Sequence, residues 1–234
     1  QRAIKLTAVS GAATGKGNYR HFMEKELHEH PVVLGDTLHQ YLEPSTRSVA
    51  LPALPFDAAR VPRLTITACG SAYLAGLVGR YWIEEVARIP VDADVASELR
   101  YRDPPLPEGG AAILISQSGE TADNLAAMKM LRDRGQKILS IVNVPESSMA
   151  PESDATVLTV AGPEISVAST KAITAQLAVL ACLAIGLGRA RGTLSAADEA
   201  ALTAELLDVP HNAAAVLERD AEIRAMAKEV AKAR

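Results

Sequence analysis

The sequence contains few aromatic residues, which occupy only 3% of its 234 positions. Aliphatic side chains must therefore fill most of the core, since hydrophobic residues as a whole reach 48%. Strands rich in Val, Ile and Leu are typical of parallel sheets that are buried on both faces. Charged residues make up 22%, a normal share for a soluble globular protein.

Cysteine is scarce as well. Cys69 and Cys182 are the two cysteines, and neither lies in a C-x-x-C pair. This spacing argues against a zinc site and against a disulfide framework, so we expect no bound metal. Two isolated cysteines in a chain of this length are typical of a reducing compartment, and we therefore expect a cytoplasmic protein.

Basic residues are not in excess. Lys and Arg number 24 against 28 Asp and Glu, which gives a net charge of -4. A nucleic-acid partner is therefore disfavoured, because phosphate backbones require clustered positive charge. The apolar run 172–188 falls short of the ~20 residues that span a bilayer. It also contains Thr174 and Gln176, so we predict a helix buried in the core and no membrane partner.

The middle of the chain alternates between strand and helix patterns. Strands are predicted at 64–69, 91–97, 111–116, 137–143 and 155–160, and helices at 72–88, 122–135 and 169–186. This alternation indicates parallel pairing with right-handed crossovers. The predicted fold class is α/β, a five-stranded parallel sheet with helices on both faces.

The flanking regions follow other patterns. Residues 1–18 are rich in glycine and are predicted to form a linker, while residues 19–42 have helical spacing with a new helix starting at Pro31. Residues 43–63 hold four prolines and are predicted to be mostly loop. Residues 195–234 are charged and rich in alanine, and Pro210 is predicted to separate two helices there.

Three predicted strand-to-helix turns are unusually rich in hydroxyl groups. They are "CGSAY" (69–73), "SQSGET" (116–121) and "AGPEISVASTK" (161–171). Their hydroxyl residues are Ser71, Ser116, Ser118, Thr121, Ser166, Ser169 and Thr170. Because ligands of parallel sheets bind beyond the carboxyl ends of the strands, these turns are candidates for one shared site.

This composition suits an anion. The first-turn N–H groups of a helix have no partner inside the helix, and the helix dipole adds partial positive charge there. Serine and threonine hydroxyls and the Gln117 amide can also donate to phosphate oxygens, so no Arg or Lys is required. We predict a cradle for a phosphate monoester after the strand 111–116.

The hydroxyl-rich turns, Lys171 and Cys69 each have an alternative interpretation. One such turn is explained by helix capping alone, whereas three at one sheet edge favour a ligand site. A dinucleotide site is disfavoured because no G-x-G-x-x-G or G-x-x-x-x-G-K-[ST] pattern follows a strand, and no cofactor is expected. Lys171 either assists an anionic ligand or is a structural lysine, which is solvated or paired, for example with Glu164. Cys69 is interpreted as a small buried residue and not a nucleophile.

The motifs "CGSAYLAGLVGRYWIEEVARIP", "ISQSGETADNL" and "PEISVASTKAITAQL" together resemble the sugar isomerase (SIS) domain family. Within it they are most similar to the first SIS module of the glucosamine-6-phosphate synthases, from about Asn18 to the end of the chain. The resemblance implies a three-layer SIS fold over residues 19–194. Residues 1–18 would then be a linker from an N-terminal domain, and 195–234 a helical connection toward a second SIS module.

The resemblance also assigns binding roles. It places phosphate contacts at Ser116, Gln117, Ser118 and Thr121, and sugar contacts at Ser71, Val167 (through its backbone) and Ser169. Ala72 stands where the family has a serine that joins the phosphate cradle, so one hydroxyl is missing here.

The implied activity is the conversion of fructose 6-phosphate and glutamine-derived ammonia into glucosamine 6-phosphate. The family's glutaminase domain, its second SIS module and its catalytic Glu, Lys and His have no counterpart in this sequence, which does not begin with Met. We therefore expect part of a longer enzyme that binds hexose 6-phosphate but is inactive alone. It is also expected to form a homodimer and to pair with a second SIS domain. The alternatives are a non-catalytic sugar-phosphate-binding module and a sugar-phosphate deaminase or isomerase without a glutaminase domain.

Overall fold

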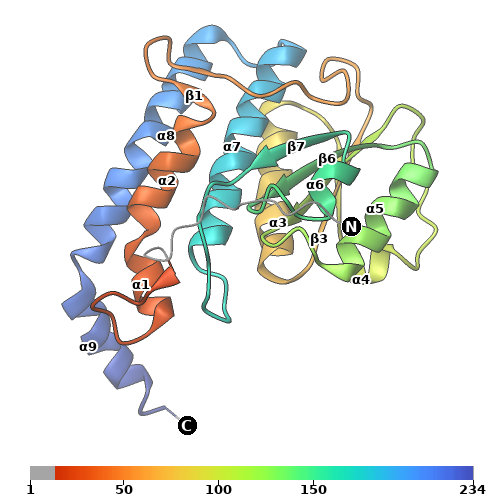
Figure 1. Ribbon diagram of the computed structural model, residues 1–234. Coiled ribbons are helices and arrows are strands. Elements are labelled where there is room, and N and C mark those ends of the chain that lie inside the picture. The colour runs from red at the N-terminus through yellow and green to blue at the C-terminus, as the bar shows by residue number, and fades with distance from the viewer. Residues whose placement is uncertain (1–13, 234) are drawn as a thin grey trace.

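A parallel sheet forms the centre of the computed structural model, which describes residues 14–233 (Figure 1). Its strands are β3 (Leu64–Ala68), β4 (Val91–Val95), β5 (Ala111–Ser116), β6 (Lys137–Val142) and β7 (Ala155–Leu158). They are ordered β4-β3-β5-β6-β7, and every pair is parallel. The five strands predicted from the sequence are therefore confirmed, with β5 at the centre.

Helices cover both faces of the sheet. One face packs against α3 (Gly70–Val86) and α7 (Lys171–Arg191), and the other packs against α4 (Ala96–Leu99), α5 (Ala122–Asp133) and α6 (Met149–Glu152). Side chains alternate along β5, so Ile113 and Ile115 point toward α3 and α7 while Ala112 and Leu114 point toward α5. Because both of its faces are buried, the central strand β5 is apolar from Ala111 to Ile115.

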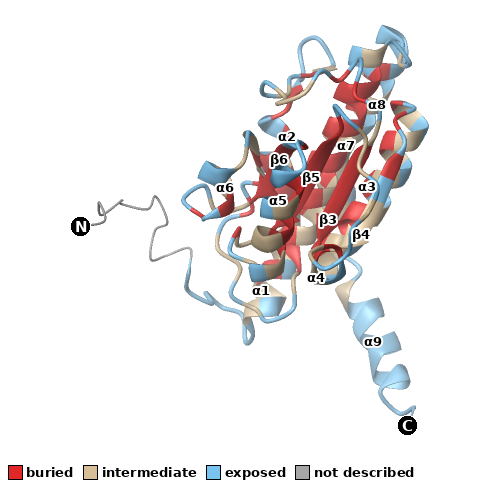
Figure 2. Ribbon diagram, turned by 90° about the vertical axis from the view of Figure 1, so that its right-hand side faces the viewer, coloured by how far each residue is buried: buried red, intermediate tan, exposed pale blue. Residues whose placement is uncertain are grey.

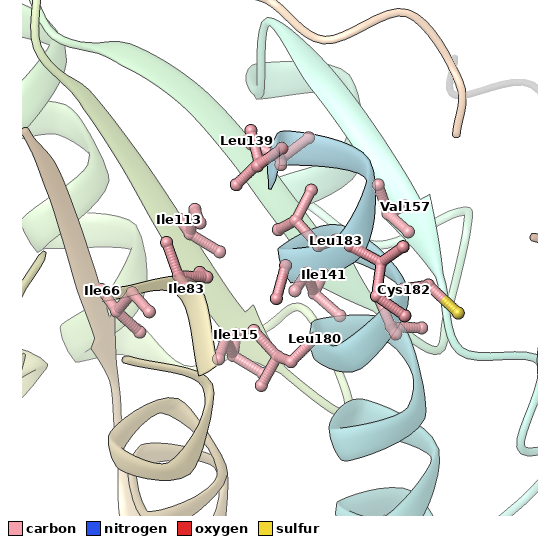
Figure 3. Packing of buried hydrophobic residues seen from close by; sticks show 14 of the residues in the cluster. Ile66, Ile83, Ile113, Ile115, Leu139, Ile141, Val157, Leu180, Cys182 and Leu183 are labelled. Carbon is pink, nitrogen blue, oxygen red and sulfur yellow. The ribbon is translucent and has the colours of Figure 1, made fainter. Parts of the chain in front are cut away.

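Helix α7 supplies much of the core. Figure 3 shows Leu180 and Leu183 against Ile115, Ile141 and Val157 of the sheet. Among the described residues, α7 is the one helix long and apolar enough to span a membrane, and 78% of its apolar window is buried inside the protein. This burial fits the prediction of a core helix.

An outer layer of helices lies beyond α7. It comprises α1 (Phe22–His28), α2 (His30–His39) and α8 (Ala196–Leu217), followed by α9 (Asp220–Val230). Helix α2 begins at the predicted Pro31 turn and lies between α7 and α8. It is tied to β7 because the Thr37 hydroxyl donates to the Thr159 carbonyl and the Tyr41 hydroxyl donates to the Leu158 carbonyl at 2.6 Å. Helix α9 has no buried residue and projects from the body (Figure 2).

One prediction for the flanks is wrong. Pro210 lies inside α8 and does not separate two helices, because the apolar side chains on both sides of it, including Leu206 and Ala213, pack on the same core. This packing outweighs the single backbone hydrogen bond that proline removes. Residues 43–63 are mostly loop, as predicted, and they include β2 (Ser48–Val49), which pairs with β1 (Leu42–Glu43) in a short hairpin.

The hairpin is held in place by α8. The Glu199 carboxylate accepts a hydrogen bond from Val49 N at 2.9 Å and pairs with Arg189 at 2.8 Å. Helix α8 therefore contacts the body of the domain. The division of the chain at residue 195 stays a prediction, as does the linker, of which residues 1–13 lie outside the described part.

The buried thiol of Cys182 gives a first prediction. Burial raises its pKa to about 12, so the reactive thiolate is absent at neutral pH. We expect a thiol reagent at pH 8 to leave Cys182 unmodified in the native protein and to modify both cysteines in denaturant. Mass spectrometry of peptides after timed labelling measures this, and rapid native labelling of Cys182 would contradict the described packing.

Candidate functional site

The turn from β5 to α5 is built around Gly119. Its φ of +64° suits glycine, and a Cβ atom there would lie 2.1 Å from the Ser147 hydroxyl. The Ser116 oxygen accepts from Gly119 N at 3.0 Å and shares a hydrogen bond with the Thr121 hydroxyl, also at 3.0 Å. These contacts fix the turn, so its hydroxyl groups are held in place without a ligand.

Capping does not account for the hydroxyl groups of this turn. Thr121 is the N-cap residue of α5, but its side chain makes no capping hydrogen bond. The Ser118 hydroxyl accepts only from the nearby Glu120 N, at 3.2 Å. The Glu120 carboxylate accepts from the Ser148 backbone and hydroxyl, at 2.5 and 2.8 Å. The N-terminus of α5 therefore has no side-chain cap of its own.

The turn from β3 to α3 lies beside it. Strands β3 and β5 are paired with Ala68 opposite Ile115, so Cys69 follows at the same level as Ser116. Buried Asn124 connects the two strand ends, since its amide donates to the Ile115 carbonyl at 2.8 Å and its oxygen lies 3.8 Å from the Cys69 sulfur. The chain then enters α3, with Ser71 in its first turn.

The Cys69 thiol is not activated. Burial raises its pKa, the negative charge of Asp123 raises it further, and backbone N–H groups offset this only in part. The thiol is therefore protonated at neutral pH, which agrees with the prediction that Cys69 is not a nucleophile. It is half-buried at the edge of the site.

The third turn, between β7 and α7, starts from a strand that is not adjacent to β5. Strand β6 separates β7 from β5, so the segment 161–170 must cross the end of β6. Asn143, which follows β6, holds the start of this segment. Its oxygen accepts from Ala161 N at 2.7 Å, and its amide donates to the Gly162 carbonyl at 2.8 Å.

The middle of this segment is anchored by Glu26 of α1. Its buried carboxylate accepts from Ile165 N at 2.6 Å, from Ser166 N at 3.1 Å, from the Ser166 hydroxyl and from the Thr170 hydroxyl at 3.3 Å. Burial raises the pKa of Glu26, but the hydrogen bonds together lower it below the ordinary value of 4.5. The carboxylate is therefore charged at neutral pH.

Helix α7 is capped by a carboxylate. Glu164 Oε1 accepts from Thr170 N at 2.9 Å and from Ala172 N at 3.1 Å, and Oε2 accepts from the Ser169 hydroxyl at 3.2 Å. The negative charge of Glu164 offsets the dipole of α7 at this end. An anionic ligand is therefore favoured at α5 and not at α7.

Lys171 is a paired lysine, but its partner is not Glu164, and its contact with an anionic ligand stays a prediction. Its side chain is buried and its Nζ lies 2.7 Å from Oε2 of Glu29, the residue between α1 and α2, so it does not pair with Glu164. It is also absent from the cavity described below. A buried lysine needs a partner, and Glu29, which lies far away in the sequence, supplies it.

The three turns enclose a cavity of about 240 Å³ at the carboxyl edge of the sheet. All seven predicted binding residues line it: Ser71, Ser116, Gln117, Ser118, Thr121, Val167 and Ser169. Glu164, Ser166 and Gln176 also contribute to its wall. The sequence pattern pointed to Ser166 as one of the hydroxyl residues of a shared site, but it pointed to neither Glu164 nor Gln176. No Lys or Arg is among these described lining residues.

The cavity is equipped for binding and lacks a free catalytic base. Its hydroxyl, amide and backbone N–H donors suit an oxyanion and a polyol. Glu164 is the one carboxylate among the lining residues, and both of its oxygens already accept hydrogen bonds. Proton transfer would require another group at the cavity mouth.

Known proteins resemble this chain in sequence and in fold. Residues 59–186 match the model of the SIS domain family, which is more than half of the chain. The chain therefore belongs to the SIS domain family, whose members adopt the α/β sheet described above.

Individual relatives show which members of the family this chain resembles. The chain is 60% identical over 229 residues to glutamine--fructose-6-phosphate aminotransferase [isomerizing] of Gluconobacter oxydans, covering 98% of this chain and 38% of the relative. The same enzyme of Zymomonas mobilis is 51% identical, with 39% of it covered. In structure, the chain resembles the C-terminal domain of glucosamine-fructose-6-phosphate aminotransferase from Francisella tularensis. That match has a TM-score of 0.85, 36% identity and coverage of 91% of this chain and 60% of that one.

The role of Glu26 can be tested through the segment it anchors. Because its pKa is lowered in the folded protein, its stabilising effect is complete above about pH 4.5 and is lost as pH falls through the lower folded value. We expect Glu26→Gln to weaken the anchor by about 1–3 kcal/mol. Amide exchange at Ile165 and Ser166 should then be about tenfold faster or more at neutral pH.

Glu24→Gln is the matched control, since Glu24 lies on the same helix and pairs with Arg224. Hydrogen exchange, expressed as protection factors from pH 3 to 7, measures both effects. Equal protection of Ile165 in Glu26→Gln and in the unmodified protein would show that Glu26 does not hold this segment.

Proposed function

We propose that this chain is the sugar-phosphate-binding SIS part of a glutamine–fructose-6-phosphate aminotransferase (isomerizing), with a hexose 6-phosphate as its ligand. The observation that carries the proposal is the cavity at the carboxyl edge of the sheet, where seven predicted contact residues meet beside the uncapped N-terminus of α5. The 60% identity to a relative of that name supports the choice within the family.

The phosphate group belongs at the β5–α5 turn. The hydroxyls of Ser116, Ser118 and Thr121 and the amide of Gln117 surround the start of α5, and all four line the cavity. Backbone N–H groups of the first helical turn add donors and partial positive charge. Because Gly119 holds the turn in its left-handed conformation, these donors are organised before the ligand arrives.

The sugar belongs on the opposite side of the cavity. Ser71 approaches from α3, while Val167 and Ser169 approach from the segment that Glu26 and Glu164 anchor. The Val167 side chain is fully exposed, so its backbone is the group suited to a hydroxyl of the sugar. In this assignment the anchored segment positions the carbon chain of the substrate over the sheet edge.

The proposed parent reaction moves ammonia from glutamine to fructose 6-phosphate and isomerises the product to glucosamine 6-phosphate. A ketose-to-aldose step needs a base that moves a proton between adjacent carbons. The described cavity residues offer no free base, and the chain spans 38% of the length of the Gluconobacter relative. We therefore assign binding to this chain and proton transfer to groups outside it.

The proposal includes partners and location. We propose a cytoplasmic homodimer in which this module also pairs with a second SIS domain. Leu74, Val78 and Tyr81 of α3 form an exposed apolar row, which supports burial against another domain.

A substitution in the β5–α5 turn tests whether this turn binds fructose 6-phosphate. Thr121→Val removes a hydroxyl that faces the cavity and keeps the shape of the side chain. We expect affinity for fructose 6-phosphate to fall about tenfold or more, because hydrogen bonds to charged groups are stronger than neutral ones. Isothermal titration calorimetry measures it, with Thr46→Val in the exposed hairpin as the control. Unchanged affinity in Thr121→Val would remove Thr121 from the site.

The missing hydroxyl at Ala72 predicts a gain of affinity. Ala72 lines the cavity next to Ser71, so Ala72→Ser places a donor where the family has one. We expect fructose 6-phosphate to bind about three- to tenfold more tightly, as one added hydrogen bond allows. The same titration checks it, and weaker binding in this variant would show that position 72 does not face the phosphate.

The chain alone should not catalyse the reaction. Incubation with fructose 6-phosphate and ammonia is expected to yield no glucosamine 6-phosphate above the rate without protein, because no free base lies in the cavity. Chromatographic detection of the amino sugar measures this. Steady product formation that Thr121→Val abolishes would contradict the division of roles proposed here.

A further inference from the structure

One polar side chain in the wall of the cavity has an oxygen without a partner. Gln176 lies in the second turn of α7 and is only 2% exposed. Among the described residues, no group donates a hydrogen bond to its Oε1 atom, which is shielded from water. The same side chain lines the cavity at the sheet edge.

Three other buried polar side chains close to the site have hydrogen-bond partners, unlike the Gln176 oxygen. Buried Asn124 donates to the Ile115 carbonyl, the Ser116 hydroxyl bonds to Thr121, and Thr170 bonds to Glu26 and Glu164. Thr67, Ser147 and Thr203 also have buried hydroxyl oxygens without a hydrogen-bond partner in the described chain, but none of those residues lines this cavity. An unpaired buried acceptor is costly, and in native proteins it points to a partner that is bound part of the time.

The chemistry of the atom restricts its partner. An amide oxygen accepts hydrogen bonds and cannot bond to a phosphate oxygen, which is also an acceptor at neutral pH. Sugar hydroxyl groups do donate. The donors predicted for the phosphate lie on the β5–α5 turn. Gln176 belongs to α7, and Ser169, a predicted sugar contact, belongs to the segment that leads into α7.

We propose that Gln176 is a further ligand-contacting residue, whose Oε1 accepts a hydrogen bond from a hydroxyl of the bound hexose phosphate. The inference rests on the proposed function and deepens it. The terminal amide torsion of glutamine is broad, so a small rotation carries the oxygen toward the ligand. Gln176 then contacts the sugar from α7, while Val167 and Ser169 contact it from the segment before that helix.

The test compares two buried glutamines. Gln176→Met keeps the length of the side chain and removes its polar group. Gln136→Met does the same for Gln136, whose amide donates to the Pro107 carbonyl at 3.0 Å and lies just before β6, at the opposite end of the strands from the cavity. Calorimetric titration with fructose 6-phosphate and with inorganic phosphate, and thermal unfolding of the free proteins, are measured for both.

The two variants should behave in opposite ways. Gln176→Met is expected to bind fructose 6-phosphate about three- to tenfold more weakly, to bind inorganic phosphate as before and to keep or raise its unfolding temperature. Gln136→Met should lose thermal stability without a change of affinity. If Gln176→Met does not fold, Gln176→Leu replaces it in the same comparison.

Other outcomes overturn the inference. Equal affinity of Gln176→Met and the unmodified protein for fructose 6-phosphate, with Thr121→Val still impaired, would leave the proposed site intact and remove Gln176 from it. An equal loss for inorganic phosphate would overturn the assignment to a sugar hydroxyl. If the unmodified protein bound neither ligand, the proposed function would fail and this inference with it.

Discussion

The parallel pairing of β3 with β5 is the constraint on which the site depends. With Ala68 opposite Ile115, both strands end at one edge, and the turns that follow open toward the same space. An antiparallel partner would carry the Ser71 turn to the other end of the sheet. Asn124 then fixes the distance between the two strand ends, because its amide bonds to the Ile115 carbonyl and its oxygen approaches the Cys69 sulfur. The register of the backbone thus determines where the walls of the cavity lie.

Charge is distributed so that one helix end remains available to an anion. Glu164 satisfies the N-terminus of α7, and Glu26 holds the segment before it. Lys171 is turned away from the cavity and paired with Glu29. The N-terminus of α5 lacks such a cap, so its backbone dipoles and the nearby hydroxyl groups remain available to an anion. A phosphate held this way is positioned by geometry, and no flexible cation has to be ordered when it binds.

The sequence was sufficient for features that depend on local pattern. Apolar runs that end in a group of hydroxyls located the ends of β3 and β5, and the seven residues named for binding line one cavity. It was not sufficient for contacts between distant segments. Nothing near Lys171 shows that its partner is Glu29, some 140 positions earlier, and Glu26 is one of several charges in a short amphipathic helix.

The order of the strands in the sheet could not be predicted from the sequence either. Composition does not show that β6 lies between β5 and β7, so the crossing segment and its Asn143 anchor were missed. Pro210 was misinterpreted because the packing of α8 outweighs a local signal for a helix break. Gln176 was noted only as a polar residue within an apolar run, and its unpaired oxygen became visible once α7 was placed against the site.

The most direct test is a crystal structure of this chain with fructose 6-phosphate. We predict the phosphorus atom beside the start of α5, with hydrogen bonds from the 116–121 turn and no Lys or Arg of this chain within contact distance. A phosphate bound instead by basic side chains elsewhere, with the 116–121 turn empty, would contradict the account.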